Sequence, residues 1–139
     1  MGKQPKVGIA IFILLASLML LREMSRRDTL SKTLNECSIY TVGNIYHVYT
    51  LRGMSHAKYT FSIAAATISD DESVNNFDTG EPWLVDMKKL AKRRLFLQIN
   101  CTNHNVHRIL WHISVPDTLN DVPKNGWREK PDWAENFIR

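Results

Sequence analysis

One uninterrupted apolar run, Val7–Leu21 (VGIAIFILLASLMLL), constrains this chain more than any other feature of its sequence. As a helix, the run would span about 22 Å at 1.5 Å per residue, which is less than the hydrocarbon core of a bilayer, about 30 Å. Lys6 precedes the run and Arg22 follows it, and their side chains can snorkel to extend its reach. The sequence therefore predicts a membrane helix, with everything after Arg22 on an aqueous side.

The same run resembles the apolar part of a secretory signal, so two interpretations are open. Ala16 and Ser17 are the only small residues near its end, and neither register gives an A-x-A-like cleavage site. We therefore expect an uncleaved anchor over residues 7–23, with a cleaved signal as the alternative. The numbers of basic residues on the two sides of the run are nearly equal, so the positive-inside rule does not decide its orientation. The simplest expectation is that the short segment of residues 1–6 stays in the cytoplasm. The rest would then lie in the periplasm, and the opposite orientation is the alternative.

The remaining chain, about 115 residues, is enough for one small domain and not for two. Residues 24–36 are polar and predict a stalk, residues 37–115 predict the domain, and residues 116–139, with three prolines, predict a tail. The expected fold class is α+β, mainly β. It consists of a transmembrane helix and one antiparallel domain with about four main strands and one short helix.

Several segments have the composition and alternation of strands. They are Cys37–Leu51, Ala57–Ile68, Arg93–Thr102 and Val106–Val115. The first two should form a hairpin, and Gly43-Asn44 suggests a bulge or bend in the first. Alternation places four large side chains of that strand on one face: Tyr40, Val42, Tyr46 and Val48. The acidic stretch Ser69–Pro82 predicts a loop, and the apolar spacing in Trp83–Lys92 predicts the helix.

Short motifs along this order of elements resemble those of a protein family. They are TVGNIY at Thr41–Tyr46, KYTF at Lys58–Phe61, RLFLQIN at Arg94–Asn100, VPD at Val115–Asp117 and VPKNGW at Val122–Trp127. Together they resemble short, uncharacterised membrane-anchored or exported β proteins of Bacteroidetes-type bacteria, in which TxGxI, YxF, RxFVxxxxxN and a terminal VPD…PxGW recur. The chain departs from that pattern after YxF, where an acidic loop and a basic segment replace a short third strand. The resemblance implies a fold and a location but no activity and no functional residue.

Two cysteines, Cys37 and Cys101, predict two unpaired thiols, one of them buried in a strand, with a disulfide in an oxidising compartment as the alternative. Cys101, His104 and His107 also offer thiolate and imidazole ligands of the kind that zinc prefers. Their i, i+3 spacing across a turn is not a recurrent zinc pattern. We therefore expect a buried cysteine beside two exposed histidines, with no metal and no cofactor.

A basic run is the other charged feature, in a chain of net charge +4. It comprises Lys88, Lys89, Lys92, Arg93 and Arg94. A solvated helix face is the simplest interpretation. Because of the anchor, anionic lipid headgroups are the preferred charged partner, and nucleic acid is not expected because no nucleic-acid module surrounds the run.

Trp127 and Trp133 are the large side chains of the proline-punctuated tail. They predict either pins that cover an open part of the sheet or an exposed docking motif that contacts a partner.

No catalytic motif is found: the chain has no G-x-S-x-G and no phosphate-binding glycine loop. We therefore expect a non-enzymatic envelope protein, held in the bilayer by Val7–Leu21, whose domain binds an unknown protein or envelope component. One alternative is a metal-binding or enzymatic accessory protein that uses Cys101, His104 and His107. Another is binding of anionic lipid or nucleic acid through Lys88–Arg94.

Overall fold

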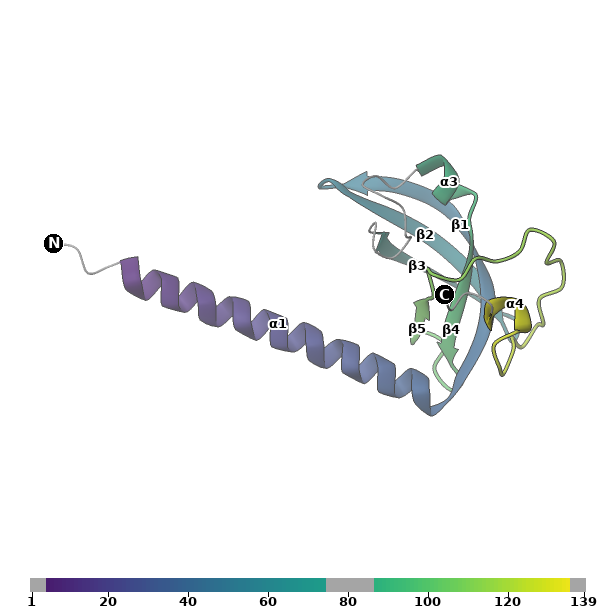
Figure 1. Ribbon diagram of the computed structural model, residues 1–139, viewed down its shortest axis with the longest axis horizontal. Coiled ribbons are helices and arrows are strands. Elements are labelled where there is room, and N and C mark those ends of the chain that lie inside the picture. Colours follow the sequence, from purple (N-terminus) through teal and green to yellow (C-terminus); the bar gives the residue numbers. More distant parts are fainter. Residues whose placement is uncertain (1–4, 75–86, 136–139) are drawn as a thin grey trace.

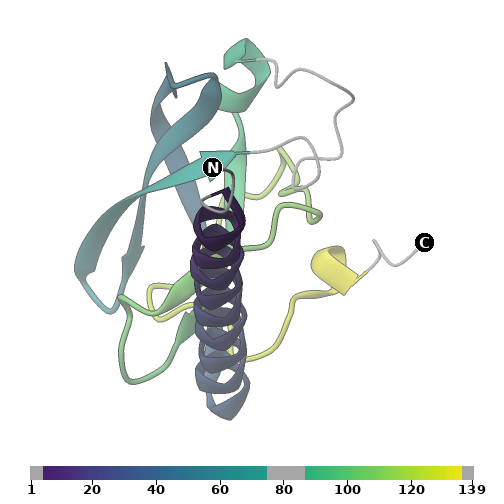
Figure 2. The ribbon, with the colours of Figure 1, turned by 90° about the vertical axis from the view of Figure 1, so that its left-hand side faces the viewer.

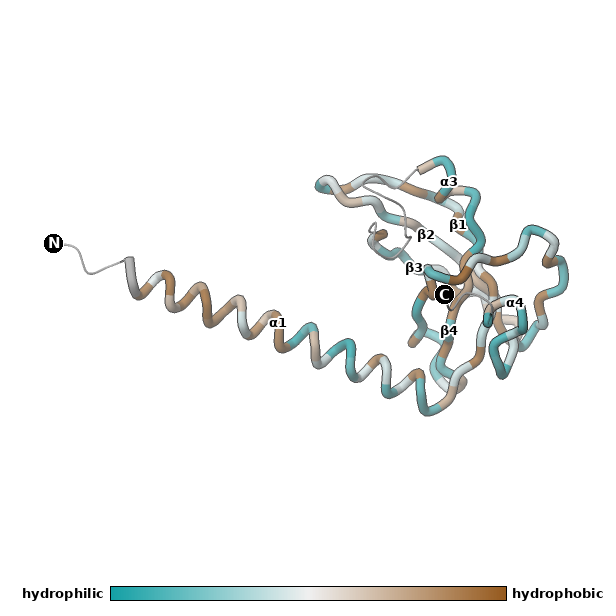
Figure 3. Tube along the Cα trace, viewed as in Figure 1, coloured by the Kyte–Doolittle hydropathy of each residue, from teal (hydrophilic) through white to brown (hydrophobic). Residues whose placement is uncertain are grey.

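The computed structural model describes residues 5–74 and 87–135 of the chain. A single long helix, α1 (Pro5–Glu36), extends away from a small folded domain (Figure 1). From Val7 onward its apolar half is exposed, and Figure 3 shows that hydrophobic residues give way to hydrophilic ones along its length. By length and composition α1 can cross a membrane. The expected stalk is helical and continuous with the apolar segment.

The domain is built on one five-stranded antiparallel sheet with the strand order β3-β2-β1-β4-β5. The strands are β1 (Ser38–Leu51), β2 (Met54–Ile63), β3 (Ala66–Val74), β4 (Arg94–Asn100) and β5 (His107–Ile109). Two short helices, α3 (Met87–Ala91) and α4 (Asp132–Glu135), accompany it. The predicted class, an apolar helix followed by a mainly β antiparallel domain, is confirmed, with five strands rather than about four.

The long strand β1 contains a bulge, close to the position that Gly43-Asn44 suggested. Its pairing with β2 shifts register between Ile45 and His47. The extra residue exchanges the two faces of the strand. Val48 therefore packs in the same cluster as Ile45, rather than on the face of Tyr40 and Val42, so the predicted assignment of Val48 was wrong.

The predicted strand Ala57–Ile68 is in fact a hairpin. β2 ends at Ile63 and β3 begins at Ala66, and the two residues of the turn, Ala64 and Ala65, have φ values of 48° and 64°. Such turns normally carry Asn or Gly, because a left-handed backbone is unfavourable for a residue with a Cβ. Two alanines give no turn signal, which is why the sequence suggested one continuous strand.

Three other boundaries differ from the predictions. The acidic stretch expected as a loop supplies the end of β3 through Val74, and its remainder, residues 75–82, lies outside the described residues. The predicted helix is described only from Met87, as α3, and residues 83–86 also lie outside. The strand expected over Val106–Val115 is limited to His107–Ile109, because the chain turns after Leu110, where the backbone N–H of Ile113 donates to the carbonyl oxygen of Leu110 at 3.1 Å.

The sheet is strongly curved and carries a hydrophobic cluster on each face. The concave cluster is the larger one and includes Tyr59, Phe61, Leu97 and Trp111, with Leu90 of α3 packed into it. The convex cluster is centred on Phe96. It is covered by the C-terminal segment, residues 116–135, which we name the C-terminal strap.

Trp127 and Trp133 hold the C-terminal strap on the sheet. Their ring centroids lie 6.4 Å and 4.9 Å from that of Phe96 and 5.9 Å from each other. The backbones of Tyr40 and Trp127 exchange two hydrogen bonds of 2.8 Å, so Trp127 occupies the edge of β1 beyond the end of β2. Of the two interpretations, the structure therefore matches a pin on the sheet.

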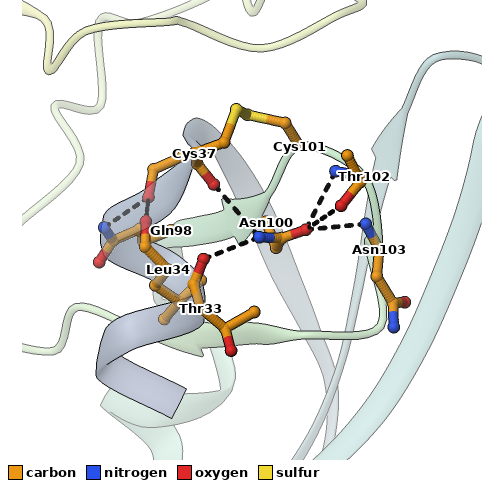
Figure 4. Close-up of a disulfide and its surroundings, with 9 residues drawn as sticks. Thr33, Leu34, Cys37, Gln98, Asn100, Cys101, Thr102 and Asn103 are labelled. Carbon is orange, nitrogen blue, oxygen red and sulfur yellow. Dashed lines mark hydrogen bonds between the residues drawn. A yellow bond between two sulfur atoms is a disulfide. The ribbon is translucent and has the colours of Figure 1, made fainter. Parts of the chain in front are cut away.

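The end of α1 is joined to the end of β4 (Figure 4). Cys37, the one residue between α1 and β1, forms a disulfide with Cys101, with their Cα atoms 5.5 Å apart. Asn100 Nδ2 donates to the carbonyl oxygen of Thr33 at 2.8 Å, which satisfies one of the helix's terminal carbonyls. Leu34 is fully buried beside this joint. We name the disulfide, Leu34 and Asn100 the junction.

The approach of the strap to β1 leaves no room for a side chain at Gly126. An added Cβ there would lie 2.5 Å from the carbonyl oxygen of Tyr40, on a backbone with φ of +69°. Gly126→Ala should therefore destabilise the protein by about 3 kcal/mol, as measured by urea unfolding of the full chain in detergent with tryptophan fluorescence. Gly53→Ala is the control, since φ is +76° there but open space surrounds the added Cβ. Equal losses would contradict close packing of the strap on Tyr40.

Candidate functional site

A polar cluster joins three strands across the concave face, and we name it the buried cluster because the side chains of Tyr59 and His107 are buried, although the Asp70 side chain is 52% exposed. It consists of Tyr59 on β2, Asp70 on β3 and His107 on β5. The Tyr59 hydroxyl lies 2.9 Å from His107 Nε2, and Asp70 Oδ2 lies 3.2 Å from the same nitrogen. The imidazole side chain is only 3% exposed. Because β2 and β5 are separated by two strands in the sheet, these contacts exist only because the sheet curves on itself.

The hydrogen bonds of His107 fix how the cluster holds its protons. Nδ1 lies 3.2 Å from the carbonyl oxygen of His104, and since a carbonyl only accepts, Nδ1 is the donor. In the neutral ring Nε2 then accepts the hydroxyl proton of Tyr59. Burial, followed by the nearby carboxylates of Asp70 and Glu72, raises the pKa of Tyr59 above its usual 10.0. Tyr59 is therefore a neutral hydrogen-bond donor at physiological pH.

A row of rings occupies the convex face beyond the strap, with His47 exposed and Tyr49 and His56 half-buried. His47, Tyr49 and His56 are stacked, with centroid distances of 5.7 Å and 5.1 Å. The ammonium of Lys58 lies 5.6 Å from the Tyr49 centroid, and the Tyr49 hydroxyl donates to Asp71, which raises the pKa of that tyrosine. We name these five residues the aromatic ladder. They combine flat ring surface with both signs of charge.

A groove on the convex face adjoins the ladder. Its volume is about 550 Å³, and it lies between the strands and the C-terminal strap. Hydroxyls of Thr60, Ser62 and Thr67 line it, together with the cationic residues Arg94 and Lys124. Thr60 lies two residues from Lys58 on the same face of β2, so groove and ladder form one continuous polar surface.

The predicted basic run is divided between the surface and the interior. Lys88, Lys89 and Lys92 are exposed. Arg93 donates to the carbonyl oxygen of Trp111 and lies 5.6 Å from the centroid of its ring. Arg94 donates to the carbonyl oxygen of Leu119 at 2.7 Å and so holds the strap. The two arginines thus have structural contacts, and only the three lysines form an exposed basic surface.

The structure does not assemble Cys101, His104 and His107 into a metal site. The Cys101 sulfur is bonded to that of Cys37, and the His107 ring contacts Tyr59 and Asp70. Within residues 5–74 and 87–135, no group of three or more His, Cys, Asp or Glu side chains is placed to hold a metal ion. The expected exposed position of His107 was wrong, because the curvature of the sheet brings its side chain into the core.

Sequence reasoning missed both the buried cluster and the aromatic ladder. The buried cluster depends on contacts between strands that are distant in the sheet, which no local pattern reports. The ladder left a signal in the closely spaced rings of His47, Tyr49 and His56. Alternation alone does not report that these rings stack on one another or that Asp71 of β3 joins them.

Comparison with protein-family models, curated proteins and solved structures finds no match to this chain. The resemblance to membrane-anchored β proteins therefore stays a prediction.

The raised pKa of Tyr59 predicts a loss of stability at alkaline pH. The pKa of Tyr59 is higher in the folded protein than in the unfolded chain. Its contribution to the free energy of unfolding is therefore complete below about pH 10 and declines above it, by up to about 1.4 kcal/mol per pH unit. Tyr59→Phe should flatten the decline in urea-unfolding free energy above pH 10, while costing about 1 kcal/mol at neutral pH through the lost hydrogen bond. Tyr46→Phe is the control because Tyr46 is 59% exposed. Parallel curves for wild type and Tyr59→Phe would contradict the assignment.

Proposed function

We propose that this chain is a single-pass membrane protein whose small domain lies outside the cytoplasm and binds an envelope partner without catalysing a reaction. The apolar half of α1 supports the membrane location, since its side chains are exposed and none of it is buried against the described part of the domain. The disulfide between Cys37 and Cys101 supports an oxidising compartment, because such bonds are rare in the cytosol.

The junction supports an uncleaved anchor rather than a signal. α1 is continuous from Pro5 to Glu36, and its last turn packs into the domain through Leu34 and Asn100. The helix that would enter the bilayer is thus part of the folded domain at its other end. Its role in the proposal is to hold the domain at a fixed place above the membrane.

The observation that carries the binding function is the polar surface formed by the aromatic ladder and the groove. The concave face is filled by the larger core, and the strap covers the apolar part of the convex face. What stays accessible is a surface of stacked rings, hydroxyls and cations, the kinds of group that bind polar partners. Tyr59 and His107 face each other inside the core, so they support folding rather than chemistry on a substrate.

The proposed compartment can be tested on the full chain in its native host. We expect Cys37 and Cys101 to resist a maleimide reagent until a reductant is added, after which both react. An alkaline phosphatase fused after Arg139 should be active, since that enzyme folds only where disulfides form. The protein should also keep the mass of the uncleaved chain. Free thiols before reduction, or an inactive fusion, would place the domain in the cytoplasm.

The proposed binding surface can be tested by photocrosslinking in cells. A photoreactive residue at His47 should give a discrete adduct, whereas the same residue at Asn120, exposed on the strap, should give none. Lys58→Gln should reduce the adduct at His47 because it removes the cation beside Tyr49. Lys130→Gln is the matched control, since it removes an exposed cation distant from the ladder. Adducts of equal yield at both positions, or an adduct indifferent to Lys58→Gln, would argue against this surface.

A further inference from the structure

We infer that the domain makes a second contact with the membrane that holds α1, through the tip of the β1–β2 hairpin. Leu51 and Met54 would enter the interface of the bilayer, and the exposed lysines of α3 would lie over anionic headgroups. This inference rests on the anchor of the proposed function but not on its binding surface.

The direction of the hairpin follows from the junction. Only Cys37 separates α1 from β1, and its disulfide with Cys101 fixes the turn between them. Figure 1 shows that β1 leaves the end of α1, curves, and runs back beside the helix. The tip of the β1–β2 hairpin therefore points to the side of the molecule toward which the apolar half of α1 extends. The domain is therefore folded back over the stalk rather than extended away from it.

The lengths of the two elements allow the tip to reach the membrane. The polar part of α1, Arg22–Glu36, is about 22 Å long at 1.5 Å per residue. β1 has 14 residues and measures about 46 Å when extended at 3.3 Å per residue. A returning strand twice as long as the stalk can reach the membrane surface even though it curves.

The tip has the side chains of an interfacial contact. Among the described residues beyond α1, large hydrophobic side chains that are more than half exposed occur at three positions, Tyr46, Leu51 and Met54. Two of them flank the turn Arg52-Gly53, so they project together from the end of the hairpin. A pair of exposed apolar side chains beside a cation is typical of segments that lie in a membrane interface.

The charges near the tip complement an anionic bilayer. α3 packs on the hairpin through buried Leu90 (Figures 1 and 2), and it carries Lys88 and Lys89 on its exposed side, followed by Lys92. Juxtamembrane lysines are attracted by anionic lipid headgroups. Asp70 and Asp71 lie opposite Tyr59 and Lys58 in the register of β3 and β2, at least four residues along β2 from Met54. Their carboxylates contact His107 and Tyr49.

The contact can be measured on the full chain with its native disulfide, reconstituted in vesicles of phosphatidylcholine and phosphatidylglycerol. An environment-sensitive fluorophore on Thr50→Cys lies beside the tip and leaves Leu51 and Met54 intact. We expect a nitroxide on the lipid acyl chains to quench this probe about twofold or more above the same probe on Asn120→Cys. The double substitution Leu51→Ser and Met54→Ser should abolish the difference in quenching between the two probes. Both residues are exposed, so the substitutions should leave the core packing unchanged.

Two further measurements test the lysines of α3 and the anchor α1 separately from the hairpin tip. Replacing Lys88, Lys89 and Lys92 by Gln should lower quenching at Thr50 to the level found in phosphatidylcholine alone, and no change would overturn the role of the lysines. A probe on Met19→Cys reports α1 itself. Quenching at Met19 but not at Thr50 would overturn the tip contact alone, whereas no quenching at Met19 would overturn the anchor and the tip contact with it.

Discussion

The junction between α1 and β4 is the constraint on which the rest of the molecule depends. Among the described residues, most of α1 is exposed and only its last turn packs on the domain, so this turn sets the placement of the helix relative to the domain. Leu34 is buried there, Asn100 bonds a helix carbonyl, and the disulfide joins residues 64 apart in sequence. In the chain-entropy account, closing a loop of that length stabilises the folded state by about 4 kcal/mol. A flexible linker would leave the domain free to tumble, whereas this junction gives it one orientation on the helix.

One extra residue in β1 then divides the convex face into two parts. Before the bulge, Tyr40 and Val42 point outward and pack under the C-terminal strap. After it, Val48 points inward, and His47 and Tyr49 take the outward positions. Before the bulge the strand thus packs apolar side chains on both faces, Ile45 on the concave one and Val42 on the convex one, whereas after it Val48 packs on the concave face. The covered part and the aromatic ladder are adjacent because the exchange of faces happens within a single strand.

The sequence was sufficient for features that depend on local composition and insufficient for those that depend on curvature. The apolar run, the long strand β1, the turn at Arg52-Gly53 and the strand over Arg94–Asn100 all follow from periodicity and turn residues. The turn at Ala64-Ala65 could not be predicted, since neither alanine favours a positive φ. The buried position of His107 could not be predicted either, because it requires β2 and β5 to meet across the concave face.

The edges of the sheet restrict how a partner can bind. The strap occupies the free edge of β1 at Tyr40, through both backbone hydrogen bonds of Trp127. At the two ends of the sheet, β3 and β5 approach each other through the contact of Asp70 with His107. An exposed strand edge is the usual template for adding a strand from another chain. Since the strap covers the edge of β1 and a side-chain contact joins the two edge strands, we expect the proposed partner to meet the convex face through side chains rather than extend the sheet.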